Sequence, residues 1–206
     1  AWVHQIKTPL SVMRLQLQSE DTPENRAMLA ELFQMEQYVT MALSYARLGN
    51  PTKDLVLTRV PLDPVIRQAI RDFAPLLIRK KLRLQYEPTA ESALTDSKWL
   101  LFILHQLLSN AVKYTDRGRV SIRVTSAPAI IVADTGIGIA PEDVPRVFEK
   151  GYTGYNGRGG QKSTGLGLYL VHQTAEMLHC RVSLSSRIGE GTSVTIDLHQ
   201  EELGKE

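Results

Sequence analysis

The chain has 206 residues, of which 43% are hydrophobic and 22% charged, with a formal net charge of +2. That length allows one or two domains, and the balanced charge argues against a nucleic-acid partner or a polybasic membrane tail. The single cysteine, Cys180, excludes an internal disulfide framework and is typical of a reducing compartment. The longest apolar run, residues 99–104, is far shorter than the roughly 20 residues that span a bilayer.

Residues 1–49 predict a helical hairpin. The break falls near residues 19–25, where Thr22 is expected to cap the second helix and Pro23 to start it. Each helix has an apolar seam of coiled-coil spacing and further apolar residues off that seam. Because a lone hairpin cannot bury two stripes, we expect two hairpins to pair as a dimeric four-helix bundle. The alternative is packing against the rest of the same chain. The seams contain Ile6, Leu10, Met13 and Leu17, then Met28, Leu32, Met35, Val39, Ala42 and Ala46.

The chain opens inside a helical pattern without a cap, which indicates a fragment of a longer protein. After a linker at 50–54, residues 55–206 predict an α/β domain. Helices are expected over 60–81, bent or ended at Pro75, over 96–115 with Asp96 or Ser97 as cap, and over 165–178. Strands are expected over 82–88, 119–125, 129–135, 180–187 and 192–199, the third being nearly all apolar and therefore central. Helices among mostly antiparallel strands predict an α+β protein with a two-layer α/β sandwich.

Polar and glycine-rich segments of this second region suit a nucleotide. Asp134 ends the central strand and could accept a hydrogen bond from an adenine amino group, with glycines after it that let the backbone approach a base. The "TGLGL" segment, residues 164–168, opens a helix whose bare N–H groups could face phosphates. Asn110 offers a hard oxygen ligand for Mg²⁺, and Lys113 lies one helical turn away. Each feature alone is weak, but their joint presence in this order is specific.

Taken together, these segments resemble the cytoplasmic core of a bacterial sensor histidine kinase. "HQIKTPL" is similar to the phospho-acceptor box, "NAVKYT" to the N box, "DTGIGI" to the G1 box, "VFEKGYTG" to the F box and "GGQKSTGLGL" to the G2 box. More narrowly, "WVHQIKTPLS" resembles small Firmicutes sensor kinases that respond to bacitracin and other antimicrobial peptides beside ABC transporters. The resemblance covers nearly the whole chain.

The resemblance implies a dimerisation and phosphotransfer hairpin over 1–49 and a catalytic ATP-binding domain of the Bergerat, or GHKL, type over 55–206. By this resemblance His4 receives the γ-phosphoryl group, Gln5 stands beside it, and Thr8 positions water to dephosphorylate the regulator. Asn110 would hold Mg²⁺ and Asp134 would read the adenine of ATP. The other implied nucleotide-binding residues are Lys113, Tyr114, Gly136, Gly138, Arg158, Thr164, Gly165, Leu166 and Gly167.

The same resemblance implies a homodimer that phosphorylates a response regulator receiver domain, with no nucleic-acid partner. It also implies the cytoplasmic portion of a membrane-anchored sensor, which could contact an ABC transporter through membrane segments outside this sequence. The remaining histidines, among them His105, are expected to be structural because none has metal-ligand spacing with a partner.

Two residues depart from the family pattern. Gln5 stands where an acid usually follows the phospho-acceptor, and Gln106 stands where the N box usually has asparagine and related ATPases have a glutamate base. Glutamine cannot abstract a proton, which argues against efficient ATP hydrolysis and leaves His4 as the nucleophile. The alternatives are a GHKL-fold ATPase or conformational clamp without phosphotransfer, and a non-catalytic dimeric scaffold.

The glutamine beside His4 gives a test. We expect Gln5 to orient the imidazole through its carbonyl while the proton leaves to water, since neutral imidazole, with a pKa of roughly 6.5, is already nucleophilic near neutrality. Gln5→Glu should therefore keep or raise the autophosphorylation rate, because a carboxylate also stabilises the developing positive charge. Initial rates with radiolabelled ATP measure this, and a large loss of rate in Gln5→Glu would contradict the role given to Gln5.

Overall fold

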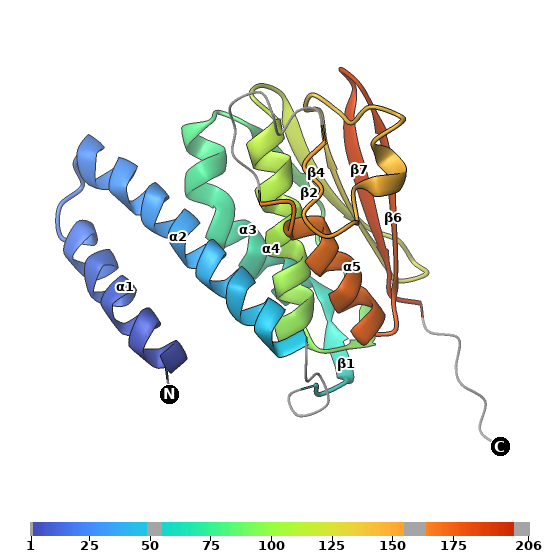
Figure 1. The fold of residues 1–206 in the computed structure, drawn as a ribbon, viewed down its shortest axis with the longest axis horizontal. Coiled ribbons are helices and arrows are strands. Elements are labelled where there is room, and N and C mark those ends of the chain that lie inside the picture. The colour runs from blue at the N-terminus through green and yellow to red at the C-terminus, as the bar shows by residue number, and fades with distance from the viewer. Residues whose placement is uncertain (1, 49–54, 155–163, 200–206) are drawn as a thin grey trace. The chain divides into compact units, whose positions relative to one another are not determined.

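The computed structural model describes residues 2–48, 55–154 and 164–199. The chain divides into two compact units, Ala1–Asn50 and Pro51–Glu206, whose elements are labelled in Figure 1. Among the described residues, no helix is both long enough and apolar enough to cross a membrane.

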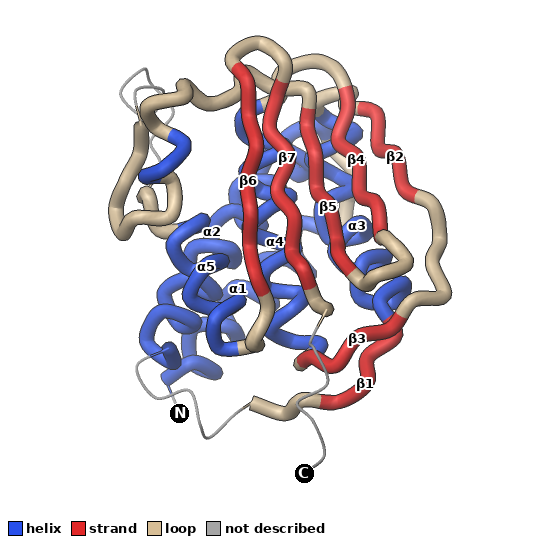
Figure 2. The backbone as a smooth tube through the Cα atoms, turned by 90° about the vertical axis from the view of Figure 1, so that its right-hand side faces the viewer, coloured by secondary structure: helices blue, strands red, loops and turns tan. Residues whose placement is uncertain are grey.

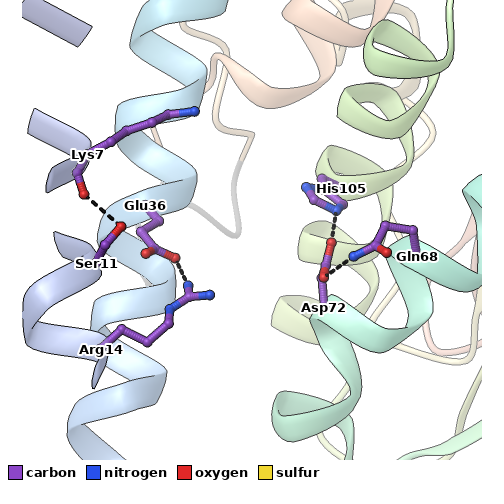
Figure 3. Close-up of polar contacts among 7 residues, drawn as sticks. All are labelled: Lys7, Ser11, Arg14, Glu36, Gln68, Asp72 and His105. Atoms are coloured by element: carbon purple, nitrogen blue, oxygen red, sulfur yellow. Dashed lines mark hydrogen bonds and ion pairs between the residues drawn. The ribbon is translucent and has the colours of Figure 1, made fainter. Parts of the chain in front are cut away.

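The first unit is a helical hairpin of α1 (Trp2–Gln18) and α2 (Pro23–Leu48). The expected cap is confirmed, because the Thr22 hydroxyl accepts the Asn25 N–H at 3.1 Å as α2 begins. Arg14 of α1 forms an ion pair with Glu36 of α2, which ties the two helices together (Figure 3). The Thr22 cap therefore fixes where α2 begins, and the Arg14–Glu36 ion pair helps to fix how the two helices pair.

Large apolar side chains stay exposed on both helices of this hairpin. On α2 they recur at steps of seven and three residues, which places them along one face of the helix. An apolar face of that extent is typical of a helix with a further partner. The exposed set comprises Val12, Met13, Leu15, Met28, Met35, Tyr38 and Tyr45.

The second unit is a two-layer sandwich, as the sequence predicted. Its five-stranded sheet has the order β2 (Arg83–Tyr86), β4 (Arg119–Val124), β5 (Ala129–Asp134), β7 (Gly191–Asp197) and β6 (Arg181–Arg187). Only the β2–β4 pair is parallel. Three helices cover one face of the sheet (Figure 2): α3 (Leu62–Arg79), α4 (Ser97–Tyr114) and α5 (Gly167–Met177). The apolar strand β5 is central, as expected.

Three local features refine the sequence-based expectation or were missed by it. Residues Thr58–Pro61 (β1) and Ser92–Thr95 (β3) form a separate two-stranded sheet, and such four-residue strands carry too little pattern to predict. A short 3-10 helix, η2 (Val144–Arg146), lies in the glycine-rich region. Pro75 was expected to bend or end α3, and the helix does not end there. The helix runs through it because buried side chains on both sides, including Phe73 and Leu76, hold it against the core.

Helix α4 is fixed at its start and along its length. Asp96 caps it, accepting the Lys98 N–H at 2.9 Å, and also accepts the Val56 N–H at 3.0 Å. Midway, Asp72 of α3 lies 2.9 Å from His105 of α4 and accepts a hydrogen bond from Gln68, as Figure 3 shows. Burial lowers the pKa of His105, although Asp72 opposes that shift. His105 therefore serves as a structural tie between α3 and α4.

The single cysteine is part of the packed core. Cys180 is a buried free thiol at the start of the β6–β7 hairpin, and burial raises its pKa to about 12. A thiol of that kind is unreactive at neutral pH, which agrees with the packing role expected from the sequence.

Candidate functional site

Asp134, the last residue of β5, supplies a partly buried carboxylate at the edge of the central strand. Its Oδ1 accepts the Gly136 N–H at 2.8 Å. Burial raises the pKa of the Asp134 carboxyl, and hydrogen bonds from the backbone of Gly136 and Thr192 oppose that shift. A hydrogen-bond donor from a ligand would offset the remaining cost of desolvation.

The loop after Asp134 lies against the end of α4. The Ile137 N–H donates to the Tyr114 carbonyl at 3.1 Å. A Cβ added to Gly136 would lie 2.3 Å from that same carbonyl oxygen, and one added to Gly138, whose φ is +71°, would lie 1.9 Å from the Arg187 carbonyl oxygen. Only glycine fits at these two positions, so the loop is a backbone cradle closely packed on both sides.

The tip of the β6–β7 hairpin supports this cradle from the other side. The Gly189 N–H donates to the Ile137 carbonyl at 2.9 Å, and the Ile139 N–H donates to the Ser186 hydroxyl at 2.9 Å. Sequence reasoning did not connect the hairpin tip with the loop, because nothing local relates segments about fifty residues apart. Ser186, Thr192 and the buried Thr115 are the supporting residues that it missed.

A second glycine-rich contact lies where α5 begins. The Gly151 N–H donates to the Gly165 carbonyl at 3.0 Å, and a Cβ on Gly165 would lie 2.3 Å from the Gly151 carbonyl carbon. Thr164 accepts the Leu166 N–H through its hydroxyl at 3.3 Å. The N-cap residue Leu166 makes no side-chain cap hydrogen bond to the first turn of α5, whose N–H groups point beyond the helix end.

Side chains of α4 approach this start of α5. A Cβ added to Gly167 would lie 3.3 Å from Gln106 Oε1 and 4.0 Å from both side-chain heteroatoms of Asn110. Gln106 is buried and Asn110 half-buried. One turn further on, the Lys113 ammonium lies 5.4 Å from the centre of the Tyr114 ring, and burial lowers the pKa of Lys113. Helix α4 thus contacts both glycine-rich segments.

The structure brings two groups of sequence-predicted residues to α4. Tyr114, Asp134 and Gly136 meet at its C-terminal end, Gly138 packs against the β6–β7 hairpin, and Asn110 lies near Gly167 one turn earlier. Gln5 and Thr8 are exposed residues of α1, in the other unit. The side chain of His4 and the whole of Arg158 lie outside the described residues.

These residues fit a nucleotide. Asp134 offers the acceptor that an amino group of a base needs, and the closely packed loop over 135–139 fixes the backbone that follows this carboxylate. The uncapped start of α5 and the partly buried Lys113 would hold phosphates. The Asn110 side-chain oxygen is a suitable ligand for Mg²⁺, which binds few protein groups and keeps several waters.

Comparison with known families supports this interpretation. Residues 95–202 match the model of the histidine kinase-, DNA gyrase B- and HSP90-like ATPases. The chain belongs to this family. The match covers α4, the β5 loop, the start of α5 and the β6–β7 hairpin, which are the elements that form the site.

Curated relatives are similar to this chain across both units. Sensor protein BceS of Halalkalibacterium halodurans is 37% identical over 205 residues, covering 98% of this chain and 61% of that protein. Sensor histidine kinase YxdK of Bacillus subtilis is 37% identical over 199 residues, covering 94% of this chain and 61% of that protein. The chain therefore spans about three fifths of these relatives, and the resemblance to Firmicutes sensor histidine kinases is confirmed.

Solved structures agree on the fold. ShkA in complex with AMPPNP has a TM-score of 0.65 at 26% identity, over 95% of this chain and 44% of that chain. The Acinetobacter baumannii histidine kinase AdeS has a TM-score of 0.64 at 21% identity, over 96% of this chain and 98% of that chain. The predicted fold class, a helical hairpin followed by an α/β ATP-binding sandwich, is confirmed.

The close packing of the ATPase loop can be tested with two glycines that have similar backbone angles. Gly138→Ala should destabilise the protein by clearly more than Gly189→Ala, because both have φ above +70° but only Gly138 has backbone within 2 Å of the added Cβ. A left-handed alanine costs about 1–2 kcal/mol by itself, so Gly189→Ala sets the baseline. Urea unfolding monitored by circular dichroism measures both. Equal losses in the two variants would contradict the packing described for the loop.

Proposed function

We propose that the protein is an ATP-dependent protein-histidine kinase of a two-component system. In this proposal it transfers the γ-phosphoryl group of Mg²⁺-ATP to His4 and then to an aspartate of a response regulator receiver domain. The observation that carries the proposal is the combination in one chain of His4 on α1 with a family ATP-binding site on the second unit. A relative named a sensor protein matches 98% of the chain and one named a sensor histidine kinase matches 94%, including both parts.

The described geometry supports a separate role for each end of the site. Asp134 would accept from the adenine amino group, with Gly136 and Gly138 beneath the base. Asn110 would hold Mg²⁺, which neutralises phosphate charge. Positioning and charge neutralisation are what phosphoryl transfer mainly requires, so no strong base is needed. The remaining proposed contacts to the nucleotide are Lys113, Tyr114, Arg158, Thr164, Gly165, Leu166 and Gly167.

The chemistry of the nucleophile follows from residues on α1. A neutral imidazole attacks phosphorus directly near neutral pH. Thr8 lies four residues after His4, on the same helix face, and is exposed, so its hydroxyl could position water in dephosphorylation of the regulator. Gln5 would orient His4 through its carbonyl.

Gln106 favours this kinase over a hydrolytic ATPase or clamp. It is buried beside Gly167, next to Asn110, at the place where a general base for water attack would be useful. Its amide can donate and accept hydrogen bonds, but it cannot take a proton. Water is therefore poorly activated there, and His4 is the better nucleophile.

We infer that residues 1–49 act as the dimerisation and phosphotransfer unit, followed by a linker at 50–54 and the catalytic unit from 55. The exposed apolar face of α1 and α2 would be covered in a homodimer by a second hairpin, forming a four-helix bundle. By similarity to the sensor kinases, the chain would be the cytoplasmic portion of a membrane-anchored sensor. Its membrane part could contact an ABC transporter.

Incubation with γ-labelled ATP and Mg²⁺ tests the kinase proposal. The wild-type chain should acquire label that is stable to alkali and labile to acid, as expected for phosphohistidine. His4→Ala should remove this label, and Asn110→Ala should lower its initial rate by more than about tenfold, because the metal ligand is lost. His199→Ala, at an exposed histidine outside the site, is the matched control and should label normally.

Mixing the His4→Ala and Asn110→Ala chains adds a test of the dimer. Labelled Asn110→Ala subunits would mean that one subunit phosphorylates the other. Release of free phosphate without labelled protein would contradict the kinase proposal and favour the ATPase. Failure to bind ATP with Mg²⁺ would favour the scaffold instead.

A further inference from the structure

The end of α3 contributes a side chain to the end of α4. Lys80 is the C-cap residue of α3, and the next residue, Lys81, has a φ of +56° that stops the helix. The Lys80 ammonium lies 2.8 Å from the Val112 carbonyl oxygen, 3.3 Å from that of Lys113 and 3.1 Å from that of Thr115. The side chain is 28% exposed, so these bonds are only partly screened by water.

These carbonyl groups belong to the segment that ends the N-box helix. The last four carbonyls of an α-helix have no partner within it and must be satisfied from outside. Here the Lys80 ammonium donates hydrogen bonds to the carbonyls of Val112, Lys113 and Thr115. The Ile137 N–H donates to the carbonyl of Tyr114. The positive charge of Lys80 also suits the negative end of the helix dipole.

Two neighbouring groups, the Lys80 ammonium and the loop after Asp134, hydrogen-bond to the end of α4. The carbonyls on either side of Tyr114 are held by one ammonium group, while the Tyr114 carbonyl is held by the loop that follows Asp134. That loop cannot shift to follow a displaced Tyr114, because Gly136 and Gly138 are closely packed on both faces. Any movement of the helix end would therefore break the Ile137–Tyr114 bond.

We propose that Lys80 is a positioning residue of the nucleotide site. It fixes the end of α4 so that Asn110, Lys113 and the Asp134 loop keep their relative places. This proposal rests on the proposed function, because it assumes that the site binds a nucleotide. The hydrogen bonds of Lys80 are present in the structure whether or not that function is correct. Lys80 contacts Lys113 at the backbone carbonyl, so it acts through the backbone of the helix.

The other contact of Lys80 does not explain its place. Its ammonium also lies 3.3 Å from Asp116 Oδ1, but the Asp116 side chain is 82% exposed. An ion pair with such an exposed partner contributes little to stability. The three carbonyl contacts, which are charge-assisted and directed at one helix end, are the interaction that matters.

Lys80→Met tests the proposal, since methionine keeps an unbranched apolar stem and removes the donors. Binding of Mg²⁺-AMPPNP, measured by calorimetry on the 206-residue chain, should weaken about tenfold, because the end of α4 is no longer fixed. In nucleotide-free protein, the Ile137 amide should exchange with solvent markedly faster, while the Val132 amide in the central strand should not change. Lys80→Arg, which retains donors, should restore most of both properties.

Lys81→Met is the matched control because it removes the same charge from the adjacent residue, and it should bind like the wild type. Unchanged binding and unchanged Ile137 exchange in Lys80→Met would overturn the proposal. An equal loss of AMPPNP binding in Lys81→Met would also overturn it, because that result would indicate a general charge effect.

If the wild-type chain itself binds no AMPPNP, the proposed function fails. The Ile137 exchange of the Lys80 variants then still decides whether Lys80 positions the loop. Should Lys80→Met fold poorly, Lys80→Leu, which also lacks donors, replaces it in both measurements.

Discussion

The hydrogen bond between the Ile137 N–H and the Tyr114 carbonyl is the interaction on which the candidate site depends. It joins the helix that carries Asn110 and Lys113 to the loop that begins at Asp134. Because Gly136 and Gly138 leave no space on either face of the loop, the bond has essentially one geometry. The ties from Asp72 to His105 and from Lys80 to the helix end hold α4 on α3, so that the helix presents a fixed edge to the loop.

Local chemistry accounts for the parts of the fold that the sequence could predict. The apolar run of β5, the Thr22 cap and the Asp96 cap are determined by neighbouring residues, and all three appear in the structure. The path of α3 through Pro75 could not be predicted, because buried contacts outweigh the local cost of a proline. The β1–β3 sheet was missed for a similar reason, since pairing between distant short segments forms it.

The candidate site likewise contains residues that the local sequence predicts and residues that only tertiary contacts bring there. The glycine motifs and Asp134 stand out in the sequence because their spacing is specific, whereas Ser186, Thr192 and Lys80 look like ordinary surface residues. They reach the site only through tertiary contacts with the β6–β7 hairpin and the end of α3. Gln106 is intermediate: the sequence marked it as unusual, and the structure adds that it is buried against the start of α5. In the proposed kinase, this neutral group beside Asn110 helps to reserve the phosphoryl group for His4.

The central claim is that α4 and the Asp134 loop together form one nucleotide site. The most direct measurement is a map of backbone amide chemical shifts by NMR during titration with Mg²⁺-AMPPNP. The largest changes are expected at Gly136, Ile137, Gly138 and Gly167 and at the Asn110 side-chain amide, with little change in β1 and β3. Shifts confined to other parts of the second unit, or none at saturating nucleotide, would contradict the claim.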